Sequence, residues 1–525
     1  MRQPGFDESP LAHLDVRLVP AAVTGWTVTA AGILWPVGQV LASCCGVLLA
    51  ASCVLVCMAR RRDQCPRLRA IGAGMLAIGV VGAGFGFAIA LRTDAVARHP
   101  IAAAFGTVAP VTVTPTESPL SLDSGNQGRL MFRATLQRLR ADEISGRVVV
   151  FARSSDFGGV IAGQPVRFTA RISRPTRHDL TVAVLNASGH PTMGQASAGQ
   201  RAAHTVRSRF AAAAREALPA DQAAMLPALV LGDTAAVSAE TSRDFRAAGM
   251  THLTAVSGAN VTIVCAAVLF SARLIGPRAA VAFAALALLT FVIVVQPTAS
   301  VLRAAVMGAI ALAGMLSSRR RQAIPALSAA VLILLVVAPH LAVDVGFALS
   351  VLATAALVVI APVWSRRLTG RGCPKPLADA LAVAWAAHVV TAPLVAGISG
   401  RLSLVAAVAN LAVAAAIAPI TVLGSAAAVL CLLWPTGAQL LIRFAGPELW
   451  WVLSVAHLAA DVPAATVPVP SGTAGVLLVG GATVLVLLLA SRWWRCRWFR
   501  LAVGLGGIAF VIWVLAWSLS GLVGP

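Results

Sequence analysis

The sequence predicts a polytopic α-helical membrane protein with about 13 transmembrane segments and one small β domain outside the cytoplasm. Apolar runs of about 20 residues recur along the chain, and each is long enough to cross a hydrocarbon core of about 30 Å. Of the 525 residues, 58% are apolar and only 12% are charged, which lies far outside the range of soluble globular proteins. Between about residues 93 and 200 the pattern changes to short segments that alternate apolar and polar residues.

Residues 1–92 contain three predicted spans. Two apolar stretches, at about 19–35 and 37–58, are separated only by a Trp-Pro pair, so we expect a tight helical hairpin. The five arginines between residues 60 and 69 then predict a cytoplasmic loop. The third span, 70–91, is rich in glycine and other small residues, which favour close helix packing, and it carries the chain outward.

Residues 93–200 form the predicted extracytoplasmic β domain. The segments 146–152 (GRVVVFA) and 165–172 (PVRFTARI) alternate apolar and polar residues, which is typical of strands in a small β-barrel or sandwich. Arginine exceeds acidic residues here, and the positive-inside rule does not explain this excess in a long translocated region. A basic face is therefore expected to bind single-stranded DNA, with anionic lipid headgroups as the competing partner. The candidate residues for this contact are Arg147, Arg153, Arg167 and Arg171.

The remainder, 201–525, is the predicted membrane channel domain. It begins with an Arg/Ala-rich amphipathic helix that ends near Pro219, within an amphipathic segment that extends over 201–250. The 404–432 stretch is too long for one ordinary span, which leaves open a broken helix or a re-entrant piece. Spans are predicted near 255–272, 278–295, 298–316, 324–338, 342–361, 378–397, 404–432, 437–460, 473–490 and 502–523.

The distribution of arginine predicts the sidedness of these spans. The loops near 273–278, 319–321, 366–375, 443 and 492–500 are basic and fall on the same side as the 60–69 loop. The opposite loops contain only Arg401 and the acidic Asp461. We therefore expect a multi-pass protein of the inner (cytoplasmic) membrane, with its N-terminus in the cytoplasm and its C-terminus outside. Charge sorting of this kind also accounts for much of the net charge of +21, with attraction to a polyanion as the alternative.

No catalytic, metal or cofactor site is expected. The sequence has no CxxC pair, and His340, His388 and His457 are too scattered to form a ligand set. His252 and Ser257 would be separated by about 140° on a helix, so they would not share a face as a nucleophile and its base. A GxxxxGK[ST] phosphate loop is also missing, so the energy for any transport would come from another protein.

The stretch 228–264 resembles the ComEC competence family, the inner-membrane DNA channel of natural transformation. The residues that carry the resemblance are Gly232-Asp233, Glu240, Phe245, Gly249, His252-Leu253, Ser257-Gly258 and Asn260-Val261. Three later segments are similar to further motifs of that family: 297–308 (PTASVLRAAVMG), 344–354 (DVGFALSVLAT) and 391–419. The matches follow one another over most of 225–490, and the strands at 146–174 are similar to the OB-like domain that family members carry.

This resemblance implies an inner-membrane channel that passes single-stranded DNA into the cytoplasm during natural competence. It also implies an external DNA receptor and a cytoplasmic helicase-like ATPase as partners. Many family members end in a metallo-β-lactamase-like domain with a His-x-His-x-Asp-His motif, but this sequence contains no His-x-His. A separate nuclease is therefore expected, while homo-oligomerisation stays open.

The candidate channel residues are the polar residues of these segments: Asp233, Glu240, His252, Ser257, Gly258, Asn260, Ser300, Arg303, Asp344, Ser350 and Asn410. Charged groups at bilayer depth usually face a bundle interior or a wet cavity, so we expect Arg303 to line the path. Snorkelling, or an ion pair with Asp344, is the alternative, and Asp344 also fits a helix N-cap. The Ser-Gly-Ala-Asn turn at 257–260 predicts a broken helix whose N–H groups face a phosphate, against a plain polar helix start.

A rival function is a small-molecule or other anion transporter or permease, or a non-transporting membrane remnant. Paired Gly/Pro-broken segments in the membrane would favour a transporter. The segments 297–303 and 391–400 are the candidate pair.

Overall fold

The computed structural model describes residues 15–35, 37–61, 66–121, 128–296, 298–316 and 323–493. The predicted last span, 502–523, and the arginines at 319–321 lie outside the described residues. The chain divides into two compact units, each described by itself below. Unit 1 comprises Met1–Ala212, Val256–Val351 and Ala428–Leu433, and unit 2 comprises Ala213–Ala255, Leu352–Ala427 and Trp434–Pro525.

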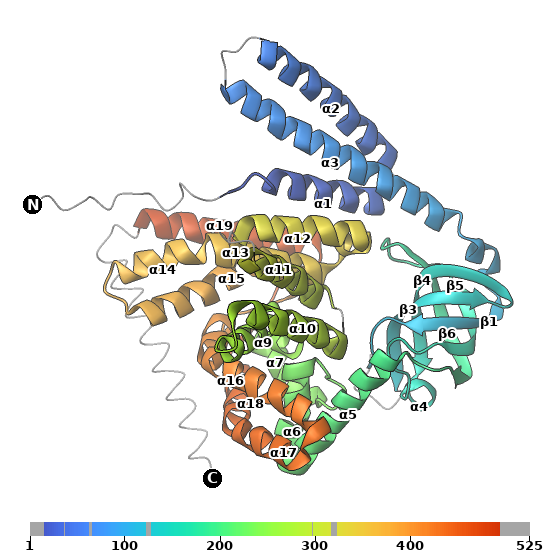
Figure 1. Ribbon diagram of the computed structural model, residues 1–525, viewed down its shortest axis with the longest axis vertical. Coiled ribbons are helices and arrows are strands. Elements are labelled where there is room, and N and C mark those ends of the chain that lie inside the picture. Colours follow the sequence, from blue (N-terminus) through green and yellow to red (C-terminus); the bar gives the residue numbers. More distant parts are fainter. Residues whose placement is uncertain are drawn as a thin grey trace, which may run out of the picture. The chain divides into compact units, whose positions relative to one another are not determined.

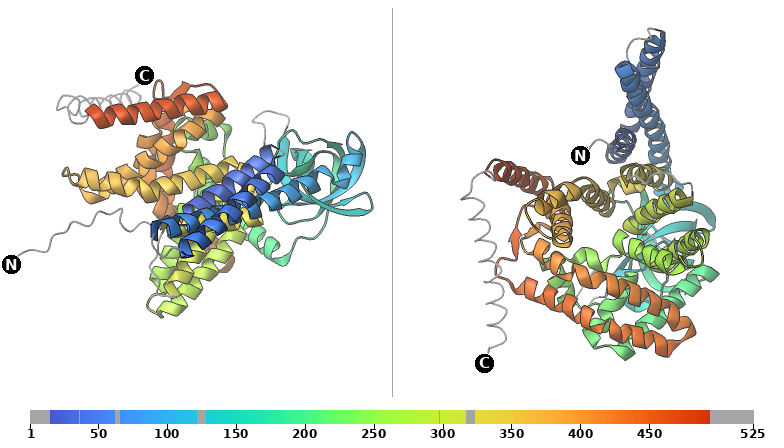
Figure 2. Two further views of the ribbon diagram at one scale, coloured as in Figure 1. Left: turned by 90° about the horizontal axis from the view of Figure 1, so that it is seen from above. Right: turned by 60° about the vertical axis from the view of Figure 1, so that its left-hand side comes forward.

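The N-terminal helices of unit 1 are α1 (Val19–Leu34), α2 (Gly38–Arg61) and α3 (Pro66–Ala97). Helices form at all three predicted stretches, but the predicted tight hairpin of the first two is not seen, because α2 packs along α3 and has few contacts with α1. Helices α2 and α3 run side by side in Figures 1 and 2. Glycines on α3 allow this close approach. A Cβ atom on Gly79 would lie 2.8 Å from Leu49 Cα, and one on Gly86 would lie 3.0 Å from Ala42 Cα. The small residues of α3 therefore serve helix packing, as the sequence predicts.

A second group of unit 1 helices follows residue 256. It consists of α9 (Gly258–Ala272), α10 (Pro277–Val295), α11 (Ala299–Leu316), α12 (Ala323–Val337), the 3-10 turn η2 (Pro339–Val343) and the first part of α13 (Val345–Val359). Helix α1 packs against α12 and η2. Trp26 Nε1 donates to the Ala342 carbonyl at 2.8 Å, and its ring lies 5.3 Å from that of Phe347. These contacts fix the turn from which α13 begins.

The strands of unit 1 close into a small barrel after the 3-10 turn η1 (Pro100–Ala104). In space they follow the order β1-β5-β6-β4-β3, and β3 pairs again with β1, while β2 pairs only with β3. β4 and β6 are parallel, and every other pair is antiparallel. The strands are β1 (Val108–Pro115), β2 (Leu120–Ser121), β3 (Arg129–Leu139), β4 (Asp142–Arg153), β5 (Val166–Ser173) and β6 (Thr181–Met193), with the short helix α4 (Ser154–Phe157) after β4.

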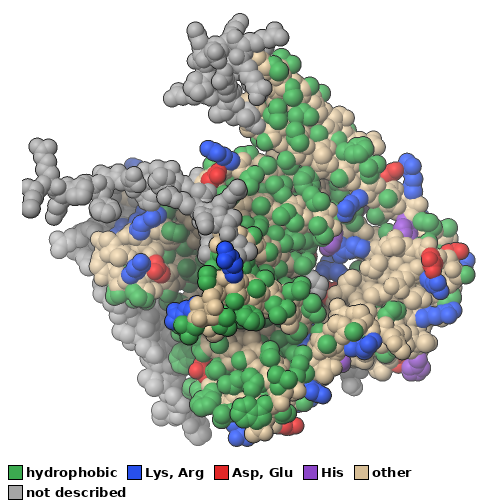
Figure 3. All heavy atoms as spheres, in the orientation of Figure 1, with side chains coloured by type: hydrophobic (Ala, Val, Ile, Leu, Met, Phe, Trp, Pro, Cys, Tyr) green, Lys and Arg blue, Asp and Glu red, His purple; other side chains and the backbone are tan. Residues whose placement is uncertain are grey.

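Alternation along the strands fills the barrel. Phe132, Phe157 and Phe168 are buried inside, and the Phe157 and Phe168 rings meet edge to face at 5.2 Å. Successive side chains of a strand point to opposite faces, so the polar residues between the buried ones lie outside. In Figure 3 polar side chains and backbone predominate over the strands, whereas hydrophobic side chains cover much of the helices.

Two hydrogen bonds join the barrel to the α10–α11 turn. Gln296 Oε1 accepts from the Ser118 backbone N–H at 3.0 Å, and Gln296 Nε2 donates to Ser118 Oγ at 2.7 Å. Gln296 is buried and has a φ of 79°, a conformation that costs a non-glycine residue about 1 kcal/mol or more. The strained backbone is therefore held by a paired contact with the barrel.

We expect Ser118 and Gln296 to be energetically coupled. In a double-mutant cycle of Ser118→Ala and Gln296→Ala, the interaction free energy should be about 1 kcal/mol, because each single change leaves a half-buried polar group unpaired. The measurement is the unfolding free energy of the four proteins in one detergent. Additive effects would show that the bond from Gln296 Nε2 to Ser118 Oγ does not hold the barrel to α10 and α11, because Ser118→Ala keeps the backbone N–H bond.

Unit 2 is helical with one small sheet. Helix α18 packs against α6 and α7, and helix α15 packs against α14 and α19. Strand β7 pairs antiparallel with β8. The elements are α6 (Ala220–Leu231), α7 (Ala239–Ala247), α8 (Thr251–Thr254), α14 (Ala361–Thr369), α15 (Lys375–Ser399), β7 (Arg401–Ser403), α16 (Ala406–Leu433, whose last turns belong to unit 1), α17 (Pro435–Phe444), α18 (Gly446–Asp461), β8 (Thr466–Pro468) and α19 (Thr473–Trp493).

Five helices among the described residues are long and apolar enough to cross a membrane: Gly74–Ala104, Pro277–Val295, Val345–Thr369, Lys375–Ser399 and Ala406–Leu433. Several shorter apolar helices accompany them, as expected of a multi-pass membrane protein. Two predicted spans differ in detail. Helix α16 is continuous through Pro419, and the predicted span 437–460 is divided at Ala445 into α17 and α18. The predicted amphipathic helix is present as α5 (Ala198–Ala217).

Candidate functional site

Polar residues from three separate segments meet in unit 1 around the guanidinium of Arg303. Arg303 lies in the first turns of α11, Ser350 lies on α13, and Gly258 begins α9. Arg303 Nε donates to Ser350 Oγ at 2.8 Å, and Ser300 Oγ lies 3.2 Å from the same oxygen. A Cβ atom on Gly258 would lie 2.9 Å from Arg303 Nη2. We call Gly258, Ser300, Arg303 and Ser350 the Arg303 cluster.

Arg303 is a buried cation without a carboxylate partner among the described residues. Its side chain contacts Ser350 and the Met307 sulfur, at 3.4 Å from Nη1, and the residue is only 6% exposed. It therefore does not snorkel outward. A guanidinium removed from water is costly unless an opposite charge approaches it. The Arg303 cluster is thus suited to an anion.

Asp344 is the N-cap of α13, which is one of the two roles expected from the sequence. Its Oδ1 accepts from the Phe347 backbone N–H at 2.8 Å. No ion pair joins it to Arg303 in the described structure. The family-like segment 344–354 therefore contributes a cap at one end and Ser350 to the Arg303 cluster at the other.

The chain is not helical at residues 255–257, and α9 begins at Gly258. The predicted turn at 257–260 is therefore a polar helix start, in which only Ser257 lies outside the helix. Helix α8 ends at Thr254, and Ser257 has extended backbone angles at the N-cap position without a capping side-chain bond. Its hydroxyl lies 3.4 Å from Oδ1 of Asn260, which is 4% exposed. The first N–H groups of α9 therefore start beside Gly258 with no side-chain cap.

Asn410 lies in unit 2 and holds a turn of that unit. Its Nδ2 donates to the Ala406 carbonyl at 2.8 Å and to the Gly249 carbonyl at 3.4 Å. Ser403 Oγ donates to the Ala247 carbonyl at 2.7 Å. The start of α16 thus fixes the chain between α7 and α8.

Three other candidate residues of unit 2 do not form a cluster. Asp233 accepts from the Ala235 N–H at 3.2 Å in the turn after α6, while Glu240 and His252 are exposed on α7 and α8. No hydrogen bond or ion pair joins the three in the part of the chain that the structure describes. One contact between α7 and α18 was not predicted from the sequence. His457 on α18 lies 3.2 Å from Asp244 on α7 and 3.5 Å from Asp461.

The four candidate arginines of the barrel lie on two strands. Arg147 and Arg153 are on β4, and Arg167 and Arg171 are exposed on β5. β6 lies between these strands in the sheet. The structure therefore brings the candidates together only in pairs.

Arg147 lies where the barrel approaches the start of α13. Its Nη1 is buried and has no hydrogen-bond partner among the described residues, and burial lowers its pKa. Asp179, Arg133, Glu117 and Asp344 lie within electrostatic reach. Burial, together with Arg147 and Arg133, lowers the pKa of His340 on η2 to about 3. His340 is therefore neutral at physiological pH.

This depressed pKa predicts acid sensitivity. The unfolded chain binds a proton at His340 below about pH 6.5 whereas the folded chain does not, so stability is lost as the pH falls toward 3. Asp179 opposes this effect, while Arg92, Arg133 and Arg147 enhance it. Allowing for solvent screening, His340→Gln should reduce the loss of stability between pH 7 and pH 5 by about 1 kcal/mol. Thermal unfolding at both pH values tests this, and identical pH dependence in the two proteins would contradict it.

Comparison with known proteins bears on these sites. Residues 229–495 match the family model described as "Competence protein", which is more than half of the chain. The chain belongs to this ComEC family of competence proteins. It is also 29% identical over 157 residues to "ComE operon protein 3" of Bacillus subtilis (strain 168), a match that covers 30% of this chain and 20% of that relative. No solved structure matches the chain.

Membership of the competence family places the Arg303 cluster in context. Gly258, Ser300, Arg303 and Ser350 all fall within the matched residues, so the family region contains the buried cation. The barrel, at residues 108–193, precedes the matched region.

Some contacts of this competence protein had no clear signal in the sequence. Gln296 stands out only as a polar residue between two apolar runs, and Ser118 has no distinguishing pattern. The pairing of Arg129 with Arg153 depends on the register of β3 and β4, which alternation alone does not define.

Proposed function

We propose that this chain is the inner-membrane channel that passes single-stranded transforming DNA into the cytoplasm during natural competence. The observation that carries the proposal is the Arg303 cluster, where three segments that resemble ComEC motifs meet around a buried cation. A phosphodiester is a complementary ligand for a guanidinium, because its oxygens accept directed, charge-assisted hydrogen bonds.

The barrel supports the same proposal as an OB-like domain. If β2 is set aside, its five strands lie in the order first, second, third, fifth, fourth, with the third and fifth parallel. This order is that of OB folds, which bind oligonucleotides. We propose that residues 93–200 receive the strand outside the membrane, and that 201–525 with its amphipathic segment 201–250 forms the channel domain.

The proposed topology has about 13 spans, with the N-terminus in the cytoplasm and the C-terminus outside. The proposed partners are an external DNA receptor, a cytoplasmic helicase-like ATPase that provides direction, and a separate nuclease. Membrane lipid surrounds the apolar helices.

Transport of a small anion is the second candidate. The same buried guanidinium favours it, because Arg303 would stabilise any anion that reached it.

A deletion strain of a competent host separates the two candidates. The DNA channel predicts loss of transformation that is restored by the wild-type gene, with uptake of small anions unchanged. Unimpaired transformation in the deletion strain would contradict the proposal.

A further inference from the structure

Between residues 129–135 of β3 and 147–153 of β4, the outward residues include four arginines and no carboxylate. In the antiparallel register, the outward residues of β3 oppose those of β4 in four pairs: Arg129 and Arg153, Met131 and Phe151, Arg133 and Val149, and Thr135 and Arg147. We call these eight residues the β3–β4 face. It runs along about 20 Å of strand, since each residue advances the chain by about 3.4 Å.

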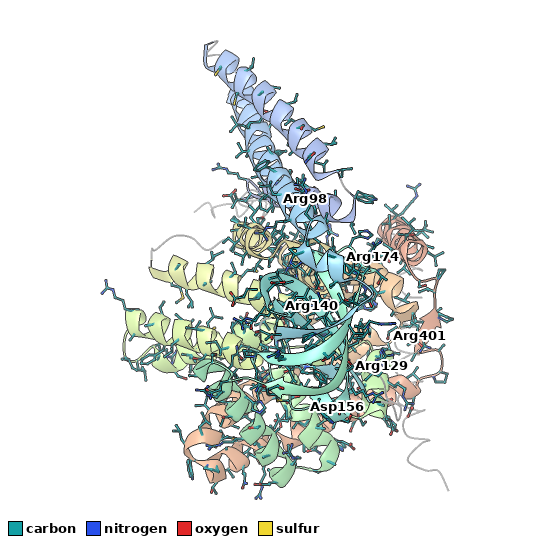
Figure 4. The ribbon with its side chains drawn as sticks, turned by 90° about the vertical axis from the view of Figure 1, so that its right-hand side faces the viewer. Arg98, Arg129, Arg140, Asp156, Arg174 and Arg401 are labelled. Atoms are coloured by element: carbon teal, nitrogen blue, oxygen red, sulfur yellow. The ribbon has the colours of Figure 1, made fainter. Side chains whose placement is uncertain are left out.

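At one end of the β3–β4 face, two like charges oppose each other. Arg129 and Arg153 are direct cross-strand partners, and both are exposed. Neither forms an ion pair with a carboxylate among the described residues. Like charges in this position destabilise a sheet, and an anion between them would remove the repulsion. Figure 4 labels Arg129, at the start of β3, and Arg140, just beyond the end of the same strand.

At the other end, the face reaches the helices of unit 1. The Ser145 carbonyl, two residues before Arg147 on β4, accepts from His99 Nε2 at 3.2 Å, and His99 directly precedes η1. Arg147 itself has a buried Nη1 atom without a partner among the described residues. Arg133 is partly neutralised, because its Nη1 lies 3.6 Å from Glu117 Oε2. An unsatisfied guanidinium donor therefore stands nearest the α13 end of the face.

The middle of the face is apolar. Phe151 and Met131 are half-buried and lie side by side between the arginines. Aromatic side chains among arginines are the combination that binds single-stranded nucleic acid, because any base can stack on the ring while the cations hold the phosphates.

We propose that the β3–β4 face binds single-stranded DNA, with phosphates held by Arg129, Arg153 and Arg147 and a base stacked on Phe151. The strand then leads toward the start of α13 and the α10–α11 turn. This inference rests on the proposed function and specifies the surface on which the strand is received. It narrows the four candidate arginines of the barrel to the pair on β4, and it adds Arg129 and Phe151.

Binding of a fluorescent oligothymidylate to the full chain in detergent tests this face. Arg129→Ala/Arg153→Ala should weaken binding about tenfold and reduce the slope of log affinity against log salt by about 1.4, because two phosphate contacts are lost. Phe151→Leu, which keeps an apolar side chain in place, should weaken binding about fivefold with the salt slope unchanged. The matched control is Arg174→Ala/Arg177→Ala, which removes two exposed arginines from the loop after β5 and should bind as wild type.

Equal weakening in both double variants would overturn the proposal, because binding would then follow net charge alone. So would full oligonucleotide binding by Arg129→Ala/Arg153→Ala together with reduced binding to vesicles of anionic phospholipid. Transformation of the deletion strain keeps this test separate from the proposed function. If the gene is needed for transformation but the Arg129→Ala/Arg153→Ala protein binds DNA normally, only the β3–β4 face is wrong.

Discussion

Replacing Arg303 with alanine is expected to reduce DNA uptake about 100-fold while the protein remains at its wild-type level in the membrane. A hydrogen bond from a charged donor to a desolvated anion contributes up to about 3 kcal/mol, and each 1.4 kcal/mol corresponds to about a factor of ten. In the wild-type protein, Arg303 is 6% exposed and lacks a carboxylate partner among the described residues. Transformation frequency and immunoblotting of the membrane fraction together measure the effect.

Two further variants make this prediction specific. Arg273→Ala is the matched control, since Arg273 is exposed and lies over the Phe270 ring at 3.8 Å, and it should transform normally. Gly258→Ala keeps Arg303 but places a methyl group 2.9 Å from the present position of Nη2, so the guanidinium must shift and uptake should fall about tenfold. Normal uptake by Arg303→Ala, or a loss of uptake that only follows a loss of protein, would mean that Arg303 has no role in the path.

Gly249→Ala is expected to destabilise unit 2 by about 3 kcal/mol. Gly249 has a φ of 68°, which costs an alanine about 1 kcal/mol. Its added Cβ would also lie 2.4 Å from Ala406 Cβ and 3.3 Å from Ala406 Cα, and a forced shift of a packed backbone costs about 2 kcal/mol. The hydrogen bond from Asn410 to the Gly249 carbonyl would be lost in the same movement.

The measurement is the thermal unfolding midpoint of the purified protein in detergent. Gly481→Ala is the control, because no atom lies within 4 Å of its added Cβ and the residue is inside α19, where alanine is the better helix former. It should unfold at or slightly above the wild-type midpoint. An unchanged midpoint in Gly249→Ala would show that the turn between α7 and α8 is not fixed by α16.

Helices that rest on long apolar runs were predictable from the sequence. The helices α1 and α2, the small-residue packing of α3 and the alternating strands of the barrel follow directly from composition and period. The break between α17 and α18 was harder to predict. Length alone suggested one span over 437–460, whereas Gly446 and Pro447 start a new helix directly after Ala445. Conversely, the length of the 404–432 stretch left a broken helix open, whereas α16 is continuous through Pro419.

The site was predictable as a set of segments but only partly as a set of contacts. Motif order brought Gly258, Ser300, Arg303 and Ser350 into consideration, and these residues do meet. Sequence spacing could not show that Asp344 caps α13 instead of pairing with Arg303, because that depends on three-dimensional packing. It also could not separate Arg153 on β4 from Arg167 on β5, because strand order is a property of the closed barrel.

The most direct test of the channel follows a labelled DNA strand into the cell. Competent cells with the gene, without it, and with Arg303→Ala are given end-labelled duplex DNA, and label that resists external nuclease is then recovered from the cytoplasm. The account predicts protected single-stranded label in the cells with the wild-type gene, none in the deletion strain, and about 1% of the wild-type amount in the Arg303→Ala strain. Protected cytoplasmic label in the deletion strain at the wild-type amount would contradict the account.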